Sequence, residues 1–408
     1  MPSQQSFYSS FLGQSATHDN SALRICIVGG GFGGLYSALA LHRRSPTWPQ
    51  PLHITLIEPR DRFNFTPLLY ELLTQELAPW EIAPTYQELL QSTAVKLCQD
   101  WVDHIDLTQR TITLRQGTPL TYDYLVVAMG SQLRPPTIAG SSAHTLPFAT
   151  VNDVWQLEER LVALSHLPMV QVVVAGAGPS GVELACKLSD RLGRRGQITV
   201  VDRRGEILRS YPERLQRVAM RALAQRRVNL YLDAAIETVD DRGLTFGYQG
   251  QTHRLPADLV VWTVGTVPRS WPGNEAPKQT SFGQCWVLPT LQLHDHRDVF
   301  VLGDMAAMPA PGRERAPTTA QAAYQAGLVV AHNLLALIAN RPLKPFIYNH
   351  LGDMLTLGQG DAVVCGFGLC ITGRLGAFSR RWAYWLRLPT MAHRWRVLKH
   401  HLGLDRKS

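Results

Sequence analysis

The chain of 408 residues is poor in cysteine, and its cysteines form neither a CxxC pair nor a zinc-ligand spacing. The six residues are Cys26, Cys98, Cys186, Cys285, Cys365 and Cys370. Because they are scattered through a long chain that has no secretory signal, the sequence predicts reduced thiols in a reducing compartment. It also predicts that no metal ion is bound.

The N-terminus lacks the features of a targeting segment. There is no Lys or Arg before Arg24, and residues 1–22 are rich in Ser and Gln without an apolar core. This composition argues against signal and transit peptides and predicts a disordered arm. The longest uncharged run, 316–340, contains Thr, Gln, Asn and His, so it predicts a core helix rather than a bilayer span.

Most of the chain also lacks net charge. Residues 371–408 hold nine basic residues and one acid, Asp405, which accounts for the whole formal charge of +8. A positive charge spread over the chain would indicate nucleic acid. A charge confined to the tail argues against that partner and indicates a local task.

A strand, a glycine loop and a helix open the ordered part of the chain. The apolar run 24–28 precedes Gly29-x-Gly31-x-x-Gly34, and a second strand, 53–57, ends at Glu58. Glycines at this spacing let pyrophosphate approach bare N–H groups at a helix N-terminus, and a following carboxylate accepts ribose hydroxyls. The pattern predicts a dinucleotide site.

The same pattern occurs a second time. The strand 171–175 precedes Gly176-x-Gly178-x-x-Gly181, and the strand 198–201 ends at Asp202. The acidic residue favours NADH because it repels a 2′-phosphate, whereas the adjacent Arg203 and Arg204 favour NADPH. Both nucleotides therefore stay open.

Two nucleotide sites in one chain predict a resident FAD and a visiting nicotinamide, because side chains cannot carry a pair of electrons. Three further strands end in glycine turns, at Gly130, at Gly265 and at Gly303-Asp304. At the last of these, Asp304 is expected to bond a ribitol hydroxyl, with the following helix directed at the flavin. The alternative is a plain strand-to-helix turn with Asp304 as N-cap.

These motifs, in this order, resemble the two-dinucleotide-binding-domain flavoproteins. The stretch 320–327, AQAAYQAG, is similar to a helix of type II NAD(P)H:quinone dehydrogenases. More narrowly, 67–73, 80–84, 352–358 and 387–390 resemble the cyanobacterial and plastid branch, members of which are implicated in reducing demethylphylloquinone. Met129 departs from the family, which usually has Thr there.

The resemblance implies that Gln321 and Gln325 lie where a lipophilic quinone meets the flavin. The two share a helix face, and neutral amides can bond a quinone carbonyl without placing a charge in an apolar pocket. The alternative is two ordinary polar helix residues. The resemblance also gives Glu183 a catalytic role on the nicotinamide side, although a carboxylate in the first turn of a helix is stabilised in any protein.

The tail combines basic residues with two apolar stripes. Phe378, Trp382, Trp385 and Leu386 form one at helical spacing, Pro389 breaks the run, and 391–402 carries the other. Aromatic side chains with Lys and Arg predict interfacial helices on a lipid surface. We therefore expect a peripheral protein on the cytoplasmic-type face of a thylakoid or plasma membrane. The alternative is a packing helix with a solvated basic face.

The predicted fold is α/β, with two Rossmann-like domains of glutathione-reductase type, the second inserted in the first. The expected ranges are 23–150 and 281–345 for FAD, 151–280 for NAD(P)H and 346–408 for membrane association. The expected activity is NAD(P)H:quinone oxidoreduction. The alternatives are a respiratory plastoquinone or menaquinone reductase, a sulfide:quinone-type enzyme, and a redox-sensing flavoprotein. A homodimer and the natural quinone are left open.

Overall fold

The structure is a computed structural model that describes residues 22–134, 137–310, 312 and 314–404. The predicted N-terminal arm, 1–22, lies outside the described residues apart from its last position. One large apolar core runs through both nucleotide-binding units and into the C-terminal region.

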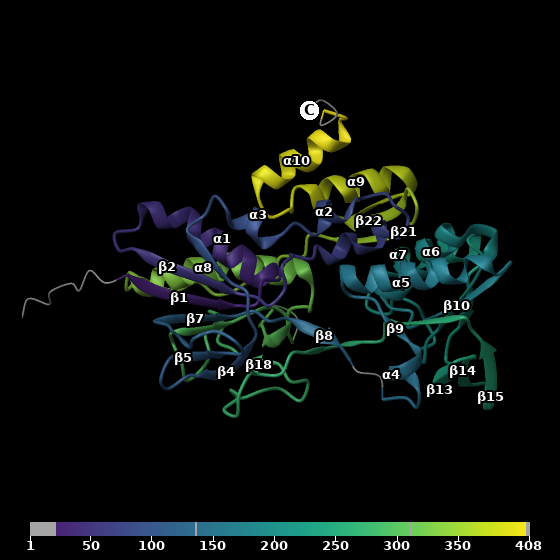
Figure 1. Ribbon diagram of the computed structural model, residues 1–408, viewed down its shortest axis with the longest axis horizontal. Helices are drawn as coiled ribbons and strands as arrows, with labels where there is room; N and C mark the ends of the chain where they lie inside the picture. The colour runs from purple at the N-terminus through teal and green to yellow at the C-terminus, as the bar shows by residue number, and fades with distance from the viewer. Residues whose placement is uncertain (1–21, 135–136, 311, 313, 405–408) are drawn as a thin grey trace, which may run out of the picture.

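A five-stranded parallel sheet forms the first unit, in the order β19-β7-β1-β2-β3. Its strands are β1 (Leu23–Val28), β2 (Leu52–Ile57), β3 (Val95–Cys98), β7 (Tyr124–Val127) and β19 (Val299–Val301). The last four residues of β1 are buried, as expected for a central strand of a parallel sheet covered on both faces. Figure 1 shows α1 (Phe32–Arg44) and α8 (Ala320–Ile338) lying along this sheet.

The second unit repeats this design, in the order β12-β11-β10-β16-β9. Its strands are β9 (Leu146–Pro147), β10 (Val170–Ala175), β11 (Gly196–Val201), β12 (Asn229–Tyr231) and β16 (Leu259–Trp262). Its helices are α5 (Val151–Ala163), α6 (Pro179–Leu192) and α7 (Glu213–Gln225). The chain enters this unit after β8 (Ser131–Leu133) and leaves it through β17 (Thr266–Pro268), and these two strands pair antiparallel. The predicted fold class, one Rossmann-like unit inserted in another, is confirmed.

Small antiparallel sheets and short helices complete the two units. The sheets are β4 (Val102–Asp106), β5 (Thr111–Leu114) and β6 (Leu120–Thr121), with β13 (Ala235–Asp240), β14 (Gly243–Tyr248) and β15 (Gln251–Pro256). The short elements are η2 (Thr66–Leu72), α2 (Pro79–Ile82), α3 (Tyr86–Leu90), α4 (Ser141–His144), β18 (Cys285–Trp286), η5 (Gly303–Met305) and β20 (Ala306–Ala307).

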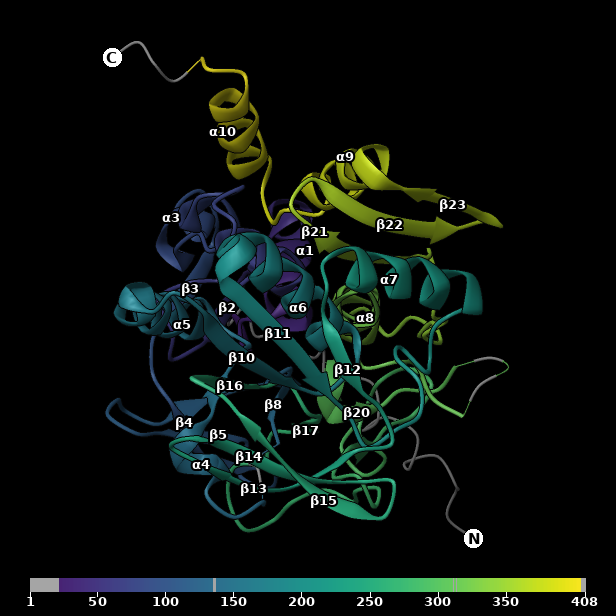
Figure 2. The ribbon, with the colours of Figure 1, turned by 90° about the vertical axis from the view of Figure 1, so that its right-hand side faces the viewer.

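The C-terminal region forms a separate layer. It contains β21 (Asp353–Gly358), β22 (Asp361–Gly366), β23 (Leu369–Thr372), α9 (Gly373–Trp385) and α10 (Met391–His401). Figures 1 and 2 show α9 and α10 on one side of the molecule, with β13, β14 and β15 on the opposite side. The two helices predicted for the tail, divided at Pro389, are therefore present.

Helix α8 is long and apolar enough to cross a membrane, yet more than half of it is buried in the protein. It packs tightly against α1 because small residues meet at the crossing: the Ser37 hydroxyl donates to Gly327 O at 3.1 Å. A side chain at Gly327 would place its Cβ 2.6 Å from Gly33 O. This agrees with the core helix that the sequence predicts, and the close crossing fixes the N-terminus of α8 beside the first glycine loop.

Candidate functional site

The first glycine loop forms a cradle with no room for side chains. Gly29 has φ +98°, and a Cβ there would lie 2.5 Å from Ala128 O. A Cβ at Gly34 would lie 1.8 Å from Gly29 O, so α1 closes directly on the loop. Gly31 is the N-cap of α1. The N–H groups at the helix N-terminus therefore face an open cradle, which is the geometry that binds pyrophosphate.

Glu58 stands at the end of β2, 2% exposed, with its carboxylate in the same cradle. Oε2 accepts from Gly30 N at 2.7 Å, and Arg60 donates to both carboxylate oxygens at 2.7 and 3.0 Å. Burial pushes the pKa of Glu58 upward, but the Arg60 bonds and charge and the backbone donors outweigh it, so the pKa lies below its ordinary value. Glu58 is therefore an anion with lone pairs left for ribose hydroxyls.

A cavity of about 220 Å³ extends from this cradle. Gly130, Gly303 and Asp304 line it, together with Met129 and Arg269. The Asp304 carboxylate accepts from the Ser131 hydroxyl at 2.6 Å, while burial raises its pKa. The N-cap of η5 is Leu302, so the alternative reading of Asp304 as a helix cap is not the one that the structure adopts.

The second glycine loop has the same construction. Gly176 has φ +108°, and a Cβ at Gly181 would lie 1.8 Å from Gly176 O. Gly178 is the N-cap of α6. Asp202 follows β11, and its Oδ2 accepts from Ala177 N at 2.7 Å, as Glu58 accepts from Gly30. The two loops are thus matched in geometry as well as in sequence.

Charges beside Asp202 differ from those beside Glu58. The Asp202 Oδ1 accepts from Arg204 N at 2.8 Å, and the side chains of Arg203 and Arg204 are exposed. Gly265 follows β16 with φ +72°. The structure therefore contains the feature that favours NADH, a carboxylate at the ribose position, and the feature that favours NADPH, exposed guanidinium groups next to it.

A second, larger cavity of about 500 Å³ adjoins the first. The two cavities share the wall residues Phe32, Thr319 and Ala320. The remaining wall of the larger cavity is formed mainly by apolar and aromatic side chains of α8, β21, β22, β23 and α9 and of the segments next to η2, α7, β21 and β22. They include Phe65, Tyr211, Tyr324, Tyr348, Met354, Val364, Phe367, Leu369, Ile371 and Tyr384. We call this space the apolar cavity.

The two predicted glutamines of α8 have different surroundings. Gln321 lines the apolar cavity, and its Oε1 accepts from the Tyr348 hydroxyl at 2.9 Å and from Leu351 N at 3.0 Å. The amide nitrogen is therefore the group left for a ligand. The amide of Gln325 instead bonds the N–H and the C=O of Asn349 at 3.0 and 2.8 Å, so it clamps that backbone. This geometry favours Gln321 over Gln325 as a ligand contact.

Glu183 lies deeper in α6 than the sequence suggested. The first turn of α6 holds no acid, so the helix-capping alternative for Glu183 is wrong. The side chain is buried, and Oε1 accepts from Thr356 N at 2.9 Å and lies 3.5 Å from the Arg380 guanidinium. Burial raises the pKa of Glu183 to about 7, although Arg380 and the Thr356 N–H act in the opposite direction.

Arg380, from α9, lies between two buried carboxylates. It is 3% exposed, and it donates to Glu71 of η2 and to the carbonyl of Pro67 as well as facing Glu183. Through these contacts Arg380 links α9 with η2 and α6, which are remote from it in the sequence. Sequence reasoning missed this residue, because Arg380 looks like one more member of the basic tail.

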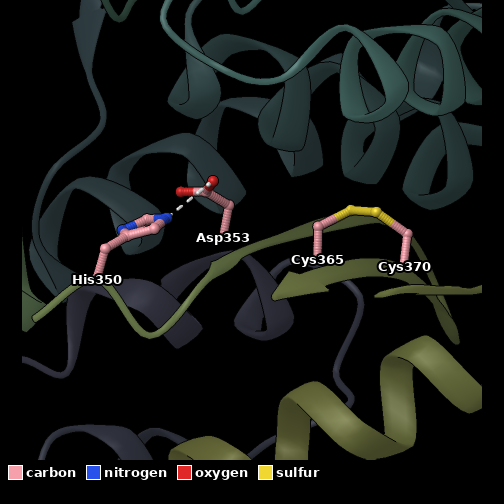
Figure 3. The surroundings of a disulfide bond; sticks show 4 residues. All are labelled: His350, Asp353, Cys365 and Cys370. Carbon is pink, nitrogen blue, oxygen red and sulfur yellow. Dashed lines mark ion pairs between the residues drawn. A yellow bond between two sulfur atoms is a disulfide. The ribbon is translucent and has the colours of Figure 1, made fainter. Parts of the chain in front are cut away.

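Cys365 and Cys370 form a disulfide between β22 and β23, where they are paired in register. The prediction that all six thiols are reduced is therefore wrong for these two, while the other four are free. Figure 3 shows the disulfide close to His350 and Asp353. Cys365 lines the apolar cavity. The CxxxxC spacing was the available signal, but the sequence could not show that a hairpin places the two side chains opposite each other.

Residues 23–327 match the family described as pyridine nucleotide-disulphide oxidoreductase. The chain is 38% identical to demethylphylloquinone reductase NdbB of Synechocystis sp., over 91% of this chain and 93% of that protein. It is 35% identical to the alternative NAD(P)H-ubiquinone oxidoreductase C1, chloroplastic/mitochondrial, of Arabidopsis thaliana, over 93% of this chain and 80% of that protein.

Among solved structures, the fold is similar to that of NDH2 from Plasmodium falciparum in complex with NADH. The TM-score is 0.82 at 15% identity, covering 94% of this chain and 98% of that one. The sulfide:quinone oxidoreductase of Aquifex aeolicus gives a TM-score of 0.75 at 20% identity, covering 95% and 96%. At these identities the likeness concerns the fold.

Proposed function

This chain belongs to the pyridine nucleotide-disulphide oxidoreductase family and is an NAD(P)H:quinone oxidoreductase; we propose that its quinone is a naphthoquinone of the demethylphylloquinone type and that it works at a membrane surface. The observation that carries this proposal is the wall of Phe32, Thr319 and Ala320 that the first cavity shares with the apolar cavity. A flavin in the first cavity and a quinone in the apolar cavity would therefore be neighbours.

The first cradle fits FAD. Bare loop N–H groups at the α1 N-terminus suit its pyrophosphate, and ionised Glu58 suits its adenosine ribose. Asp304, held by Ser131, suits a ribitol hydroxyl, with Gly130 and Gly303 leaving room beside it. When bound, FAD supplies the two-electron chemistry that no side chain can provide.

The second cradle fits NAD(P)H by the same chemistry, through Gly176, Gly178 and Gly181, with Gly265 at the facing turn. We place NADH ahead of NADPH, because the Asp202 carboxylate, fixed by two backbone donors, repels a 2′-phosphate. The exposed Arg203 and Arg204 reduce this preference without reversing it.

The apolar cavity fits a flat, fused aromatic ring. Phe32, Phe65, Tyr324 and Tyr384 supply ring faces and edges, which favour offset and edge-on contacts with another ring. The Gln321 amide nitrogen can donate to a quinone carbonyl, since its oxygen is already engaged. A neutral donor suits this site because it brings no charge into an apolar space.

The C-terminal layer supports the membrane part of the proposal. Of the 19 large apolar side chains that are exposed in the described residues, 11 lie between Phe367 and Leu404. Those on α9 are Leu375, Phe378 and Trp382, which stand on the outer face of the helix at 73%, 70% and 49% exposure. Exposed aromatic and aliphatic side chains next to Arg374 and Lys399 suit the boundary of an anionic bilayer.

The test is a turnover assay of the full-length holoenzyme in anionic liposomes. NADH and NADPH are each combined with a demethylated naphthoquinone and with a plastoquinone-type acceptor. We expect the naphthoquinone to give the higher kcat/KM, and NADH to exceed NADPH by less than about 100-fold because of the neighbouring arginines. Equal or higher turnover with the plastoquinone-type acceptor would favour a general respiratory reductase instead.

A further inference from the structure

Four polar side chains form a series of polar contacts along the wall of the apolar cavity. The Tyr348 hydroxyl donates to Gln321 Oε1 at 2.9 Å and lies 3.2 Å from His350 Nδ1. His350 Nε2 lies 3.4 Å from Asp353 Oδ2, as the dashed line in Figure 3 shows. All four residues line the cavity. The series leads outward from Gln321, because the His350 side chain is 44% exposed.

The bonding chemistry fixes the direction of this series. An amide oxygen only accepts, so the hydroxyl proton of Tyr348 points to Gln321, and the Tyr348 oxygen must accept from His350 Nδ1–H. The other ring nitrogen of His350 faces the Asp353 carboxylate. Of the four side chains, Tyr348 and His350 therefore carry the protons that can move along this series.

Quinone reduction needs such a supply. The balanced reaction is NAD(P)H plus one proton plus quinone, giving NAD(P)+ plus quinol. The hydride brings two electrons and one proton, so the second proton of the quinol comes from solvent. An apolar cavity holds few water molecules that could carry it, and the protein wall must provide a path.

Other protic side chains line the cavity, but their connections differ. Tyr211 and Tyr384 are also on its wall. Tyr348 is hydrogen-bonded to the exposed His350. Within the described part of the chain, neither the Tyr211 nor the Tyr384 hydroxyl has such a bond to an exposed histidine or carboxylate. Glu183 is buried beside Arg380 and is not a residue of the cavity wall.

We propose that Tyr348 is the proton donor to the quinone and that His350 and Asp353 are positioning residues that resupply it. The Tyr348 hydroxyl turns from Gln321 Oε1, which keeps the Leu351 N–H as a donor, to the reduced quinone oxygen. The Tyr348 O–H bond then breaks as an O–H bond forms on that oxygen. The His350 Nδ1–H bond then breaks and restores the Tyr348 hydroxyl, and His350 takes a proton from solvent. The inference rests on quinone reduction in the apolar cavity and adds the route of its proton.

The test compares two electron acceptors in the full-length holoenzyme carrying Tyr348→Phe, His350→Gln or Asp353→Asn. A soluble naphthoquinone takes two electrons and two protons, whereas ferricyanide takes electrons alone. For Tyr348→Phe we expect kcat with the quinone to fall at least ~100-fold, the lower end of what a positioned acid contributes. Ferricyanide reduction and the quinone Kd, measured by tryptophan fluorescence quenching, should change less than ~2-fold, and the solvent isotope effect on quinone reduction should increase. Imidazole should restore activity to His350→Ala.

Matched controls are Tyr248→Phe and His253→Gln, in β14 and β15 on the side of the molecule opposite α9. Both should behave as the unmodified enzyme with either acceptor. A Tyr348→Phe enzyme that keeps its kcat with the quinone overturns the proposal. So does a parallel loss with both acceptors, which indicates a structural role, or a raised KM at constant kcat, which indicates binding alone. If the unmodified enzyme reduces ferricyanide but no quinone, the proposed function fails instead.

Discussion

At Glu58, a backbone N–H and a guanidinium converge on one buried carboxylate, and this arrangement gives a sharp prediction. Glu58→Arg places a second cation beside Arg60 and removes the ribose acceptor, so the purified protein should be colourless. Glu58→Gln keeps the shape but weakens charge-assisted bonds, and should lower FAD affinity by about 10-fold or more. FAD content, measured by absorbance after gel filtration, checks both.

The exposed Glu159 of α5 supplies the control. Glu159→Arg should retain its yellow colour. Circular dichroism separates a folded, colourless Glu58→Arg protein from an unfolded one. Yellow Glu58→Arg protein with a full complement of FAD would contradict the assignment of this cradle.

Glu183 gives a prediction about pH. Its pKa is raised from 4.5 to about 7, mainly by burial. Between these two pH values the folded protein therefore holds a proton that the unfolded chain has released. Stability from this group is therefore full below about pH 4.5 and is lost as pH rises through 7. Glu183→Gln should be more stable than the unmodified protein above pH 7, by a free energy of unfolding on the order of 3 kcal/mol.

Urea unfolding at a series of pH values measures this difference. The two proteins should converge toward pH 5, and Glu159→Gln should show no such divergence. A constant gap between Glu183→Gln and the unmodified protein across the whole range would mean that Glu183 does not titrate in this window.

Glu58 and Asp202 were predictable because the end of the second strand of a βαβ unit lies beside the glycine loop, so a carboxylate there contacts the loop. Tyr348 and Arg380 were not. The partners of Arg380 are hundreds of positions away in the chain, and nothing local distinguishes it from the exposed Arg381. Long-range contacts of this kind leave no periodic pattern in a sequence.

At the scale of elements, α9 reverses the usual arrangement of an amphipathic helix. Its inner face holds Gly376 and the charged Arg380, whereas Leu375, Phe378 and Trp382 face outward. Replacing these three by Ser removes apolar contacts worth about 1.5–3 kcal/mol each, so binding to anionic liposomes should fall at least ~100-fold. Liposome co-sedimentation measures the loss.

Phe282→Ser, another exposed aromatic position, is the matched control and should sediment as before. Turnover with a soluble quinone should survive in the triple variant, which shows that the protein remains folded. Undiminished co-sedimentation of the triple variant would refute membrane docking through α9.

Helical periodicity located α8, α9 and α10 correctly, but it could not say which side of each helix meets the protein. For α9, the apolar stripe suggested a lipid face, and the buried side was not recognised because its fully buried residues are a glycine and an arginine. The disulfide of β22 and β23 was missed for a related reason. The pairing of Cys365 with Cys370 depends on the turn between β22 and β23. No regular alternation of apolar and polar residues in this segment indicated where that turn lies.

At the scale of the molecule, the duplicated strand–loop–helix pattern was enough to predict two nested units, and the family to which the chain belongs confirms that expectation. The C-terminal layer was expected to be an attached membrane segment. Its membrane role stays a prediction, but Arg380 makes it part of the core as well.

Arg380→Met therefore tests the integrity of the whole molecule. It leaves Glu71 and Glu183 buried without their cation, and breaking a buried pair in this way costs about 3–5 kcal/mol. Urea unfolding should show this loss, while Arg374→Met, at an exposed position on the same helix, should stay within about 0.5 kcal/mol. Equal stabilities of the two variants would show that the pairing contributes nothing.

The place of Arg380 also bears on how the protein is made. Both glycine cradles are complete once the ribosome has synthesised α8, but the cation that neutralises Glu71 and Glu183 comes from one of the last helices to emerge. A nascent chain consequently carries uncompensated acids in its centre until translation is nearly finished. Products of premature termination should therefore be short-lived, because they lack the helix that completes the buried pairing of these acids.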